Sequence, residues 1–563
     1  MKPWQLGNTS VRSAMRLRDG LIVLASSGRE GALRGVNGDS VWRDVLGEAG
    51  IVQLGEDETN SVGRKWRAAM CRLGFLYDNV GREYQQQVGP MDFITPSGHR
   101  LIDATSGSAQ QECYLRAIGG IWLDVSFDKH KVAGTFSPLR HVLRVLREVE
   151  SKSESSGVTA VEFALFIQTT DNTVPSEEIV QSIFSHRSNR ALAANKKRFD
   201  ESAIAAMAES EGSVSASTYR DYMDMNLRYL KSTGLFRAFG RGISLVELKS
   251  VLIDALIADD SPPMNVVDYW TQLTNGIVLP TDDLVAANEA LLVVKDEAIR
   301  RGLVVSPVPS QGAPVADVSK ARHDIELQIA LDDENLFYRA QRIEWEEIAE
   351  FLALLNGKKP PAGSDVIIPS GEMPAYFEWT LWRAFLAINS LANQPHEARK
   401  FSIDQDMRPL GHAPGGTPDL VFEFETFVLV VEVTLTTGIR QEGTEGVPVR
   451  HHVYKVQNEY PNKPVFGLFV APKLAPSTIE TFRIGKWFPP DADYSVDVLI
   501  VPTTIQHFRN LFVAMFMANS ATPSVIRQVV ELSIVEASKC PTPAKWGQAI
   551  QSIFEKQTAE LVA

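Results

Sequence analysis

Two continuous apolar runs constrain the fold of this 563-residue chain more than any other feature. Residues 427–433 read Phe-Val-Leu-Val-Val-Glu-Val, and residues 465–470 read Val-Phe-Gly-Leu-Phe-Val. Runs of this kind suit central strands that are buried on both faces of a sheet. Because helical patterns stand on either side of them, the C-terminal region is expected to form an α/β domain.

Length and composition indicate a multidomain globular protein. A chain of 563 residues exceeds the size at which one hydrophobic core keeps growing. No apolar run approaches the roughly 20 residues of a membrane helix, and the N-terminus does not have the pattern of a secretory signal. The three cysteines, Cys71, Cys113 and Cys540, lie far apart and form no zinc-type cluster. This usage fits a reducing compartment and predicts a cytoplasmic protein.

The net charge of −13 neither establishes nor excludes a nucleic-acid partner. Phosphate binding is driven by cations, so an acidic average argues against it at first. The acids are concentrated, however, between residues 317 and 350, while several helical patterns nearer the N-terminus are basic. The local arrangement of charge therefore decides the question.

The texture of the sequence predicts a multidomain protein of the α/β and α+β classes, with four domains. Proline-rich stretches at residues 261–263 and 306–314 are typical of connectors. The expected domains span residues 1–130, 131–250 with a winged-helix-like pattern, 251–345 as a helical linker, and 346–563 as the C-terminal α/β domain.

Two segments of the N-terminal half share a pattern that is typical of winged-helix modules. Residues 64–75 form a basic helical pattern that ends near a glycine and continues as an extended run. Residues 226–236 repeat this scheme, and residues 240–242 can turn a hairpin behind it. A helix, a glycine stop and a β-hairpin wing would follow one another in such a module. We therefore expect two winged-helix-like modules in tandem.

Basic side chains on helical patterns are the candidates for DNA contacts. The pattern from Ser137 to Val149 predicts a helix with one apolar face and with arginines away from that face. A solvated surface is the commoner explanation for such arginines, and a phosphate contact is the alternative. The candidates are Arg12, Arg16, Arg18, Arg67, Arg140, Arg144, Arg220 and Arg228.

The segment that carries chemistry contains two acids thirteen residues apart, Asp419 and Glu432. Glu432 interrupts an apolar run that otherwise fits full burial, and an ionised carboxylate there costs several kcal/mol unless a cation or hydrogen bonds compensate. Neighbouring strands lie about 4.8 Å apart, so the two carboxylates can reach one Mg²⁺ ion. The alternative is a structural pair, such as Glu432 bridged to an arginine.

These residues resemble the PD-(D/E)xK nuclease superfamily, and more specifically the AlwI-like type IIS restriction endonucleases, which include strand-specific nicking enzymes. A Pro-Asp pair alone is a weak motif, but the two further acids at thirteen-residue steps and the following Pro-Val-Arg-His-His make the resemblance specific. It covers most of the chain and is carried by residues 6–12, 16–21, 376–379, 416–419, 431–435 and 445–452.

The resemblance implies roles for individual residues. Asp419 and Glu432 would be the metal ligands, and the Val433 carbonyl would add a third oxygen. Glu378, in a helix before the sheet, matches an acid that supports the metal site. Two further active-site positions match Glu445 and His452.

One departure from the superfamily concerns the lysine expected two residues after the second acid, where this chain has Thr434. That lysine would orient the attacking water and stabilise developing charge. His452, or a second ion held by Glu445, can take over the task. His451 is an alternative to His452, because neighbouring residues on a strand point to opposite faces.

The resemblance implies a magnesium-dependent enzyme that hydrolyses DNA a few base pairs outside an asymmetric recognition site. Winged-helix-like modules would read the site, and a PD-(D/E)xK domain with a mixed sheet flanked by helices would cut. Because the chain has one carboxylate set, cutting both strands needs a transient homodimer or a second nuclease subunit. Without either, the enzyme would nick one strand.

Two other kinds of protein remain as alternatives. One is a non-catalytic regulator that binds DNA through winged-helix modules, and the other is a nuclease acting on RNA or branched DNA. The sequence has no Walker A loop, no GxGxxG after a strand and no HExxH, so it offers no support for ATP use, dinucleotide chemistry or zincin-type hydrolysis.

Overall fold

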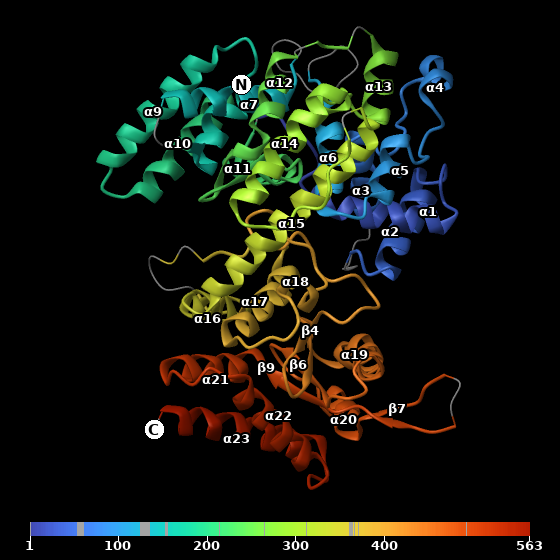
Figure 1. Cartoon of the computed structure of the whole chain (residues 1–563), viewed down its shortest axis with the longest axis vertical. Helices are drawn as coiled ribbons and strands as arrows, with labels where there is room; N and C mark the ends of the chain where they lie inside the picture. Colours follow the sequence, from blue (N-terminus) through green and yellow to red (C-terminus); the bar gives the residue numbers. More distant parts are fainter. Residues whose placement is uncertain are drawn as a thin grey trace. The chain divides into compact units, whose positions relative to one another are not determined.

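The computed structural model divides into two compact units, residues 1–329 and 330–563 (Figure 1). The predicted division into four domains is finer than this and stays a prediction, and its boundary at residues 130 and 131 lies outside the described residues. The structure describes residues 2–52, 61–123, 136–152, 156–212, 214–259, 261–263, 265–310, 312–359, 364, 366–369, 371–490 and 493–562.

The first unit is mainly helical. Its N-terminal half contains η1 (Ala14–Arg16), α1 (Leu17–Ser27), α2 (Gly35–Glu48), α3 (Ser61–Arg72), α4 (Arg82–Val88), α5 (Pro96–Asp103), α6 (Gly107–Gly119), α7 (Pro138–Lys152) and β1 (Gly157–Val158). There follow α8 (Ala160–Glu162), η2 (Phe163–Ile167), α9 (Ser176–Leu192), α10 (Lys196–Glu211), α11 (Ala216–Ser232), β2 (Phe236–Phe239) and β3 (Gly242–Leu245). The last elements are η3 (Glu247–Lys249), α12 (Ser250–Ala258), α13 (Val266–Asn275), η4 (Pro280–Asp282), α14 (Leu284–Arg300) and α15 (Val315–Gln341), and α15 continues into the second unit.

The helix predicted after Ser137 is present as α7 and begins at Pro138. Proline suits the first helical position because its missing N–H would have no partner there. The apolar face that the sequence predicted is buried, and it packs in the main core of the first unit. The residues of this face are Val142, Leu143, Val145, Leu146 and Val149.

The hairpin predicted after residue 240 is confirmed. Strands β2 and β3 pair antiparallel up to Phe239 and Gly242, which leaves a two-residue turn with Gly240 at φ +57°. A left-handed residue in such a turn matches the twist of the flanking strands, and glycine takes this conformation without strain. Strand β1 joins the other side of β3, so β2 lies at an edge of the three-stranded sheet.

The first of the two predicted modules differs from the second. Helix α3 ends before Gly74, which has φ +70°. The extended run behind it forms an isolated bridge from Leu76 to Ile94, with α4 in between, where a tight hairpin was expected. The two segments therefore share the helix and its glycine stop, but the hairpin follows only the second.

The second unit surrounds a four-stranded mixed sheet in the order β4-β5-β6-β9. Its strands are β4 (Leu420–Glu423), β5 (Val428–Val433), β6 (Val465–Ala471) and β9 (Ile500–Thr504), and β7 (Lys486–Trp487) and β8 (Val496–Asp497) form a separate ribbon. Its helices are α16 (Trp345–Leu355), α17 (Met373–Ile388), α18 (Pro395–Ala398), α19 (Ile439–Glu459), α20 (Pro476–Ile484), α21 (Ile505–Met517), α22 (Pro523–Ala537) and α23 (Pro543–Val562).

The two apolar runs form the central strands of this sheet, as predicted. Strand β5 lies parallel to β6, and β6 lies parallel to β9, whereas β4 runs antiparallel to β5. Every residue of β6 is buried, and so is every residue of β5 except Val433. Burial on both faces explains why neither strand alternates polar and apolar residues.

Helices cover both faces of the sheet in the second unit (Figure 1). On one face, Phe385 of α17 stacks on Phe422 of β4 with ring centroids 4.6 Å apart. On the other face, Val453 of α19 lies against Gly467 of β6, where a larger residue would meet it. Helices α17 and α19 therefore reach the sheet from opposite sides. Among the described residues, no helix combines the length and apolarity that a membrane span needs.

Candidate functional site

The carboxylates of Asp419 and Glu432 meet at one edge of the sheet in the second unit. Asp419 directly precedes β4, and Glu432 is the penultimate residue of β5. Because the two strands are antiparallel, the start of β4 lies opposite the end of β5, where Leu420 pairs with Val431. Asp419 Oδ2 accepts a hydrogen bond of 2.8 Å from the Val433 amide. The backbone thus fixes the aspartate beside the glutamate strand.

Glu378 joins this edge from α17. It lies in the second turn of a helix that is buried from Ala375 to Ile388, and it is itself only 5% exposed. Its Oε2 atom accepts a 2.7 Å hydrogen bond from the Ala413 amide, in the loop that leads to Asp419. Electrostatic repulsion from Asp419 and Glu432 reaches Glu378, so the three carboxylates form one group.

Glu445 and His452 reach the site from a helix, and the strand expected around residues 451 and 452 is wrong. Both residues lie on α19, and their seven-residue separation is close to two helical turns, so they share one face. His452 is 6% exposed, and its Nδ1 atom lies 2.8 Å from Glu432 Oε1. His451 is exposed, and its ring centroid lies 5.3 Å from that of Trp487.

Thr434 occupies the position of the usual lysine and is itself part of the cluster. Its hydroxyl group lies close enough to the Glu445 carboxylate to oppose the rise of that group's pKa, and it accepts a 3.1 Å hydrogen bond from the Thr436 amide. The residue is 8% exposed. The carboxylate of Glu445, on α19, therefore lies next to position 434, where the superfamily has its lysine.

Gln441 anchors the start of α19 and was missed in the sequence. The side chain is fully buried, and its Nε2 atom donates to the carbonyls of Thr436 and Lys473 at 2.8 and 2.9 Å. Its Oε1 atom accepts from the Ala475 amide at 2.9 Å. These partners follow the carboxyl ends of β5 and β6, so one amide joins both loops to the helix that carries Glu445. A glutamine four residues before an acid gives no signal that could have shown this.

Burial and like charge raise the pKa of each carboxyl group in the cluster. Burial is the largest cause for Glu378, Asp419 and Glu432, and repulsion from the neighbouring acids adds to it. Burial also raises the pKa of Glu445, against the hydrogen bonds from two threonine hydroxyls. Burial lowers the pKa of His452 to about 4, so the imidazole is neutral at neutral pH.

The predicted alternative, a structural pair between Glu432 and an arginine, is not present among the described residues. Within the residues that the structure describes, neither Glu378 nor Asp419 forms an ion pair with a lysine or arginine. Like charges buried together without a counter-charge are costly, and a divalent cation removes that cost. The oxygen donors of Asp419 and Glu432 are of the kind that Mg²⁺ prefers. As they stand, however, no three His, Cys, Asp or Glu side chains among the described residues are arranged to hold a metal ion.

Most of the arginines predicted to contact DNA form ion pairs or hydrogen bonds with other groups of the first unit. The clearest cases are Arg140 and Arg67, which are 3% and 9% exposed. Arg140 donates to the carbonyls of Gly119 and Asp259, and Arg67 pairs with Asp39. Exposure on the helix surface, which the sequence pattern indicated for Arg140, is therefore wrong.

The other candidates are partly buried, with one exception. Arg12, Arg16, Arg18, Arg144 and Arg228 bind acids or backbone carbonyls in the fold. Arg220, on α11, is the one exposed residue of the eight. Contacts of all eight with DNA stay predictions.

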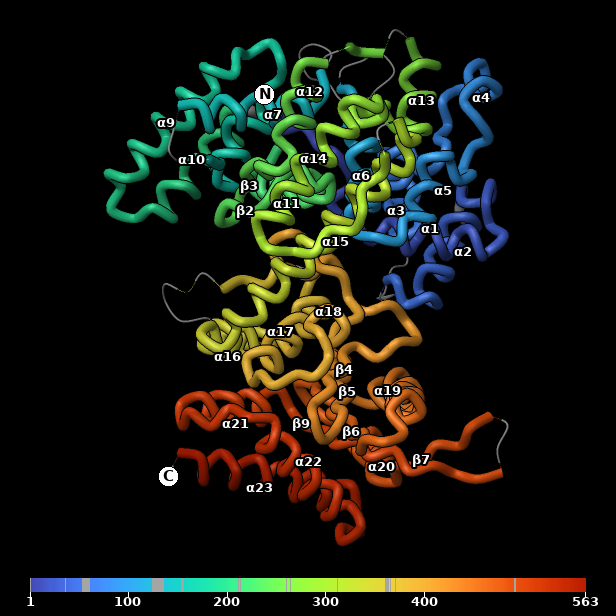
Figure 2. The backbone as a smooth tube through the Cα atoms, in the orientation of Figure 1, coloured from blue at the N-terminus to red at the C-terminus, as the bar shows by residue number. Residues whose placement is uncertain are grey.

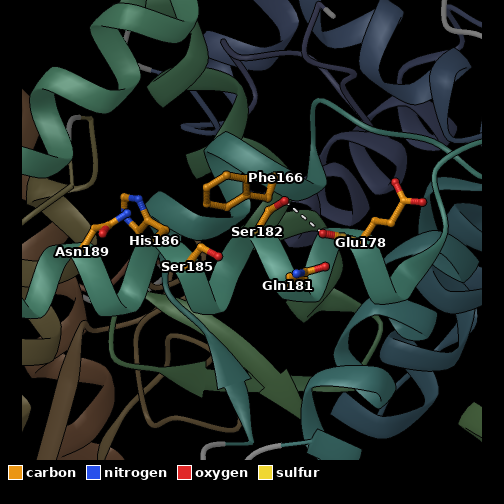
Figure 3. Close-up of a pocket in the computed structure, with 7 residues that line it drawn as sticks. All are labelled: Phe166, Glu178, Gln181, Ser182, Ser185, His186 and Asn189. Carbon is orange, nitrogen blue, oxygen red and sulfur yellow. Dashed lines mark hydrogen bonds between the residues drawn. The ribbon is translucent and has the colours of Figure 1, made fainter.

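A groove along α9 is a separate feature of the first unit (Figure 3). Hydroxyl and amide side chains line it, and Ser182 donates a 3.0 Å hydrogen bond to the Glu178 carbonyl. His186 forms part of its wall and lies 5.5 Å from the ring of Phe166. The groove has none of the clustered carboxylates of the second unit, so it is not the predicted catalytic site.

A buried carboxylate cluster at the edge of a mixed sheet defines a candidate hydrolase site, and comparison with known families identifies the class. The model of the AlwI restriction endonuclease family matches residues 71–511, which is well over half of the chain. The chain belongs to this family and is therefore a restriction endonuclease, a nuclease that acts on DNA. All the candidate catalytic residues lie within the matched range.

No curated protein matches the chain significantly. Among solved structures, the small subunit of the heterodimeric restriction endonuclease R.BspD6I is 20% identical, with 38% of this chain and 98% of that chain covered at a TM-score of 0.29. The BpuJ1 endonuclease binding domain, solved with modified DNA, is 14% identical, with 42% and 86% covered at a TM-score of 0.30. At such low scores neither likeness supports a conclusion about this chain.

Proposed function

We propose that this restriction endonuclease is a magnesium-dependent, site-specific deoxyribonuclease of the PD-(D/E)xK type. The observation that carries the proposal is the group of buried carboxylates around Asp419 and Glu432, which has no lysine or arginine partner among the described residues. Burying several carboxylates together is electrostatically unfavourable, and a bound cation compensates for it, so such a group indicates a cation site. Asp419 and Glu432 would hold the metal, with the Val433 carbonyl as a third oxygen.

Bound Mg²⁺ supplies charge for the phosphate oxygens and lowers the pKa of a bound water. The protein's own residues do the positioning. The Val433 amide orients Asp419, the Ala413 amide orients Glu378, and His452 contacts Glu432. Glu445 lies beside Thr434, and its carboxylate would accept a proton or orient the attacking water in place of the missing lysine.

Type IIS cleavage, a few base pairs outside an asymmetric site, is the second part of the proposal. The carboxylate cluster lies wholly in the second unit. The first unit is therefore free to read DNA while the second cuts it, and this separation supports the proposal. The hairpin β2–β3 behind α11 fits a winged-helix-like recognition module.

Incubation of supercoiled plasmid DNA with the purified chain and Mg²⁺ tests the proposal. We expect relaxed or linear product, and loss of product with Asp419→Asn, while binding of duplex DNA persists. Asp406→Asn, in the loop before the site, is the matched control and should leave cleavage intact. A plasmid that stays supercoiled would favour the regulator alternative, and activity in the Asp419→Asn variant would refute the catalytic assignment.

Nicking and double-strand cleavage are distinguished by the products. One carboxylate set cuts one strand at a time, so we propose that linear product requires a transient homodimer or a separate nuclease subunit. Run-off sequencing of both strands gives the site, the offset and the strand together. Linear product whose rate is independent of enzyme concentration, with nicked DNA never accumulating, would contradict this requirement.

A further inference from the structure

The arginines of the first unit fall into two groups, those paired within the protein and those without a partner among the residues that the structure describes. Most form ion pairs or donate to backbone carbonyls. Arginines with no such partner among the described residues of this unit lie at Arg29, Arg64, Arg82, Arg198, Arg220, Arg237 and Arg241. A guanidinium group that is already paired must break that contact before it binds a phosphate, whereas an unpaired one does not.

Three of these unpaired arginines belong to one structural module, α11 with the hairpin β2–β3. Arg220 lies in α11, Arg237 lies in the edge strand β2, and Arg241 stands in the two-residue turn beside Gly240. All three are exposed. Helix α11 packs against both strands, and Figure 2 shows β2 and β3 beside it.

The acids of the same module are neutralised. Residues 216–245 contain two acids, Asp221 and Asp224, both on α11. Arg12 Nη2 lies 3.0 Å from Asp221 Oδ1, and Arg12 Nη1 lies 3.3 Å from Asp224 Oδ2. Arg228 Nε lies 3.3 Å from the other oxygen of Asp224. The module therefore presents positive charge in a chain whose net charge is −13.

We propose that α11 and the hairpin β2–β3 form the surface that contacts the phosphate backbone of duplex DNA, with Arg220, Arg237 and Arg241 as the phosphate ligands. Arg12 and Arg228 act indirectly, because they cancel the two acids that would repel the DNA. This proposal rests on the proposed function for its partner, and charge complementarity is what selects a polyanion.

The geometry of the hairpin exposes the side chains of Arg237 and Arg241 to solvent. The tight turn at Gly240 places Arg241 at the tip, and residues 237 and 239 share one face of the edge strand because side chains alternate along it. An edge strand with arginines resists pairing with another strand and leaves its outer side for a different partner. The phosphate backbone of DNA is such a partner, because it binds arginines and does not need to pair with the strand.

The test measures binding of the full chain to a fluorescein-labelled duplex of random sequence in EDTA, by fluorescence anisotropy over a range of salt concentrations. Each phosphate contact contributes about 0.9 to the slope of log affinity against log salt. We expect Arg220→Gln, Arg237→Gln and Arg241→Gln each to reduce the slope by about 1 and the affinity by about 3-fold or more at moderate salt. Arg29→Gln, in the loop after α1, and Arg82→Gln, at the start of α4, make the same charge change at exposed positions outside this module and should change neither quantity.

A second set of variants separates direct from indirect roles. Arg12→Gln should weaken binding, and adding Asp221→Asn with Asp224→Asn should restore it, because the acids are then neutral without their partner. A direct phosphate contact by Arg12 would not be restored in this way. Thermal unfolding of each variant shows whether the fold is intact, and Arg237→Lys with Arg241→Lys should keep the salt slope.

The proposal is overturned if the triple glutamine variant binds duplex DNA with the slope of the unmodified chain, or if the control variants lose as much. Failure of the proposed nuclease function appears elsewhere, as absent plasmid cleavage by a chain that still binds DNA. Because EDTA removes catalysis from the binding measurement, the two outcomes are distinguishable.

Discussion

The Nδ1 atom of His452 lies 2.8 Å from Oε1 of Glu432, and this contact links helix α19 to the carboxyl end of β5. Burial, with the nearby charge of Lys455, lowers the pKa of His452 to about 4. A neutral imidazole that donates from Nδ1 to a carboxylate keeps Nε2 as an acceptor. The histidine therefore fixes the orientation of Glu432 without adding charge.

Replacement of His452 by alanine should lower kcat for plasmid cleavage by about 10–100-fold, the usual effect of losing a partner of a metal ligand. More Mg²⁺ should also be needed for half-maximal activity, since Glu432 is no longer held. His451→Ala is the matched control on the same helix, because its exposed ring contacts Trp487 and has no carboxylate partner in the described part of the chain. A larger loss with His451→Ala would assign the role to the other imidazole.

Replacement of Thr434 by valine keeps the shape of the side chain and removes its hydroxyl group. Glu445 then loses the nearby hydroxyl group that favours its ionised form, so its raised pKa rises further. We expect a fall in kcat of roughly 10-fold and a shift of the pH–rate profile to higher pH, with little change in DNA binding. Thr434→Ser should retain most of the activity, and an unchanged profile in Thr434→Val would exclude this role.

Replacement of Gln441 by leucine should separate α19 from the loops behind β5 and β6. The change removes three hydrogen bonds of a buried amide and leaves the carbonyls of Thr436 and Lys473 without that donor. Unfolding free energy should fall by about 2–4 kcal/mol, and cleavage should fall further than stability alone explains. Gln457→Leu is the control on the same helix, since that side chain donates one exposed hydrogen bond, to Asp497. Equal losses in both variants would show that Gln441 has no special positioning role.

The central strands and the meeting of two candidate acids at one edge of the sheet could be predicted from sequence because their signal is local. An acid inside an apolar run has few explanations, and Glu432 lies where that pattern placed it. The helix around Glu445 and His452 was not predicted, because Gly443, Gly446 and Pro448 disfavour a helix. Packing of Val449, Val453 and Val456 against the rest of the core stabilises it nonetheless.

The arginines show a different limit of sequence reasoning. Helical spacing correctly predicted which apolar residues of α7 face the core, but it gave no information on the partners of the charged ones. Arg12 pairs with an acid 209 residues away, and Arg140 binds carbonyls on other elements. Contacts between distant segments depend on the tertiary fold, which the pattern of a single helix does not contain.

Replacement of Asp419 by asparagine should stabilise the metal-free protein near neutral pH. The pKa of this carboxyl group is raised above its ordinary 3.8 by burial and by Glu432, so the folded state binds its proton more tightly than the unfolded state. The stabilisation from that proton is present at low pH and is lost as the pH rises through the raised pKa. We expect a gain of about 1–2 kcal/mol at neutral pH and little gain near pH 4.

Urea unfolding in EDTA at the two pH values measures this difference, and Ca²⁺ or Mg²⁺ provides a second comparison. A cation at about 100 times its Kd adds about 2.7 kcal/mol to the unfolding free energy of the unmodified chain. The Asp419→Asn variant should gain much less. Equal stabilisation of both proteins by the cation would place the metal elsewhere, and a destabilised Asp419→Asn variant at neutral pH would contradict the repulsion described above.

Replacement of His141 by glutamine should remove an acid-sensitive element of the first unit. His141, on α7, is 3% exposed, and burial lowers its pKa to about 4, while its Nε2 atom lies 3.1 Å from Thr170 Oγ1. The unfolded chain binds a proton at the ordinary pKa of about 6.5, so stability is lost as the pH falls from about 6.5 to about 4. The loss is at most about 3 kcal/mol, and it should be smaller in His141→Gln.

Unfolding by urea at a series of pH values, followed by tryptophan fluorescence, measures the slope of stability against pH in this window. His99→Gln is the control, because it makes the same substitution at an exposed histidine of the same unit, on α5. That variant should keep the slope of the unmodified chain. If His141→Gln keeps it as well, the imidazole is charged inside the fold, and the acid sensitivity of the first unit must come from other groups.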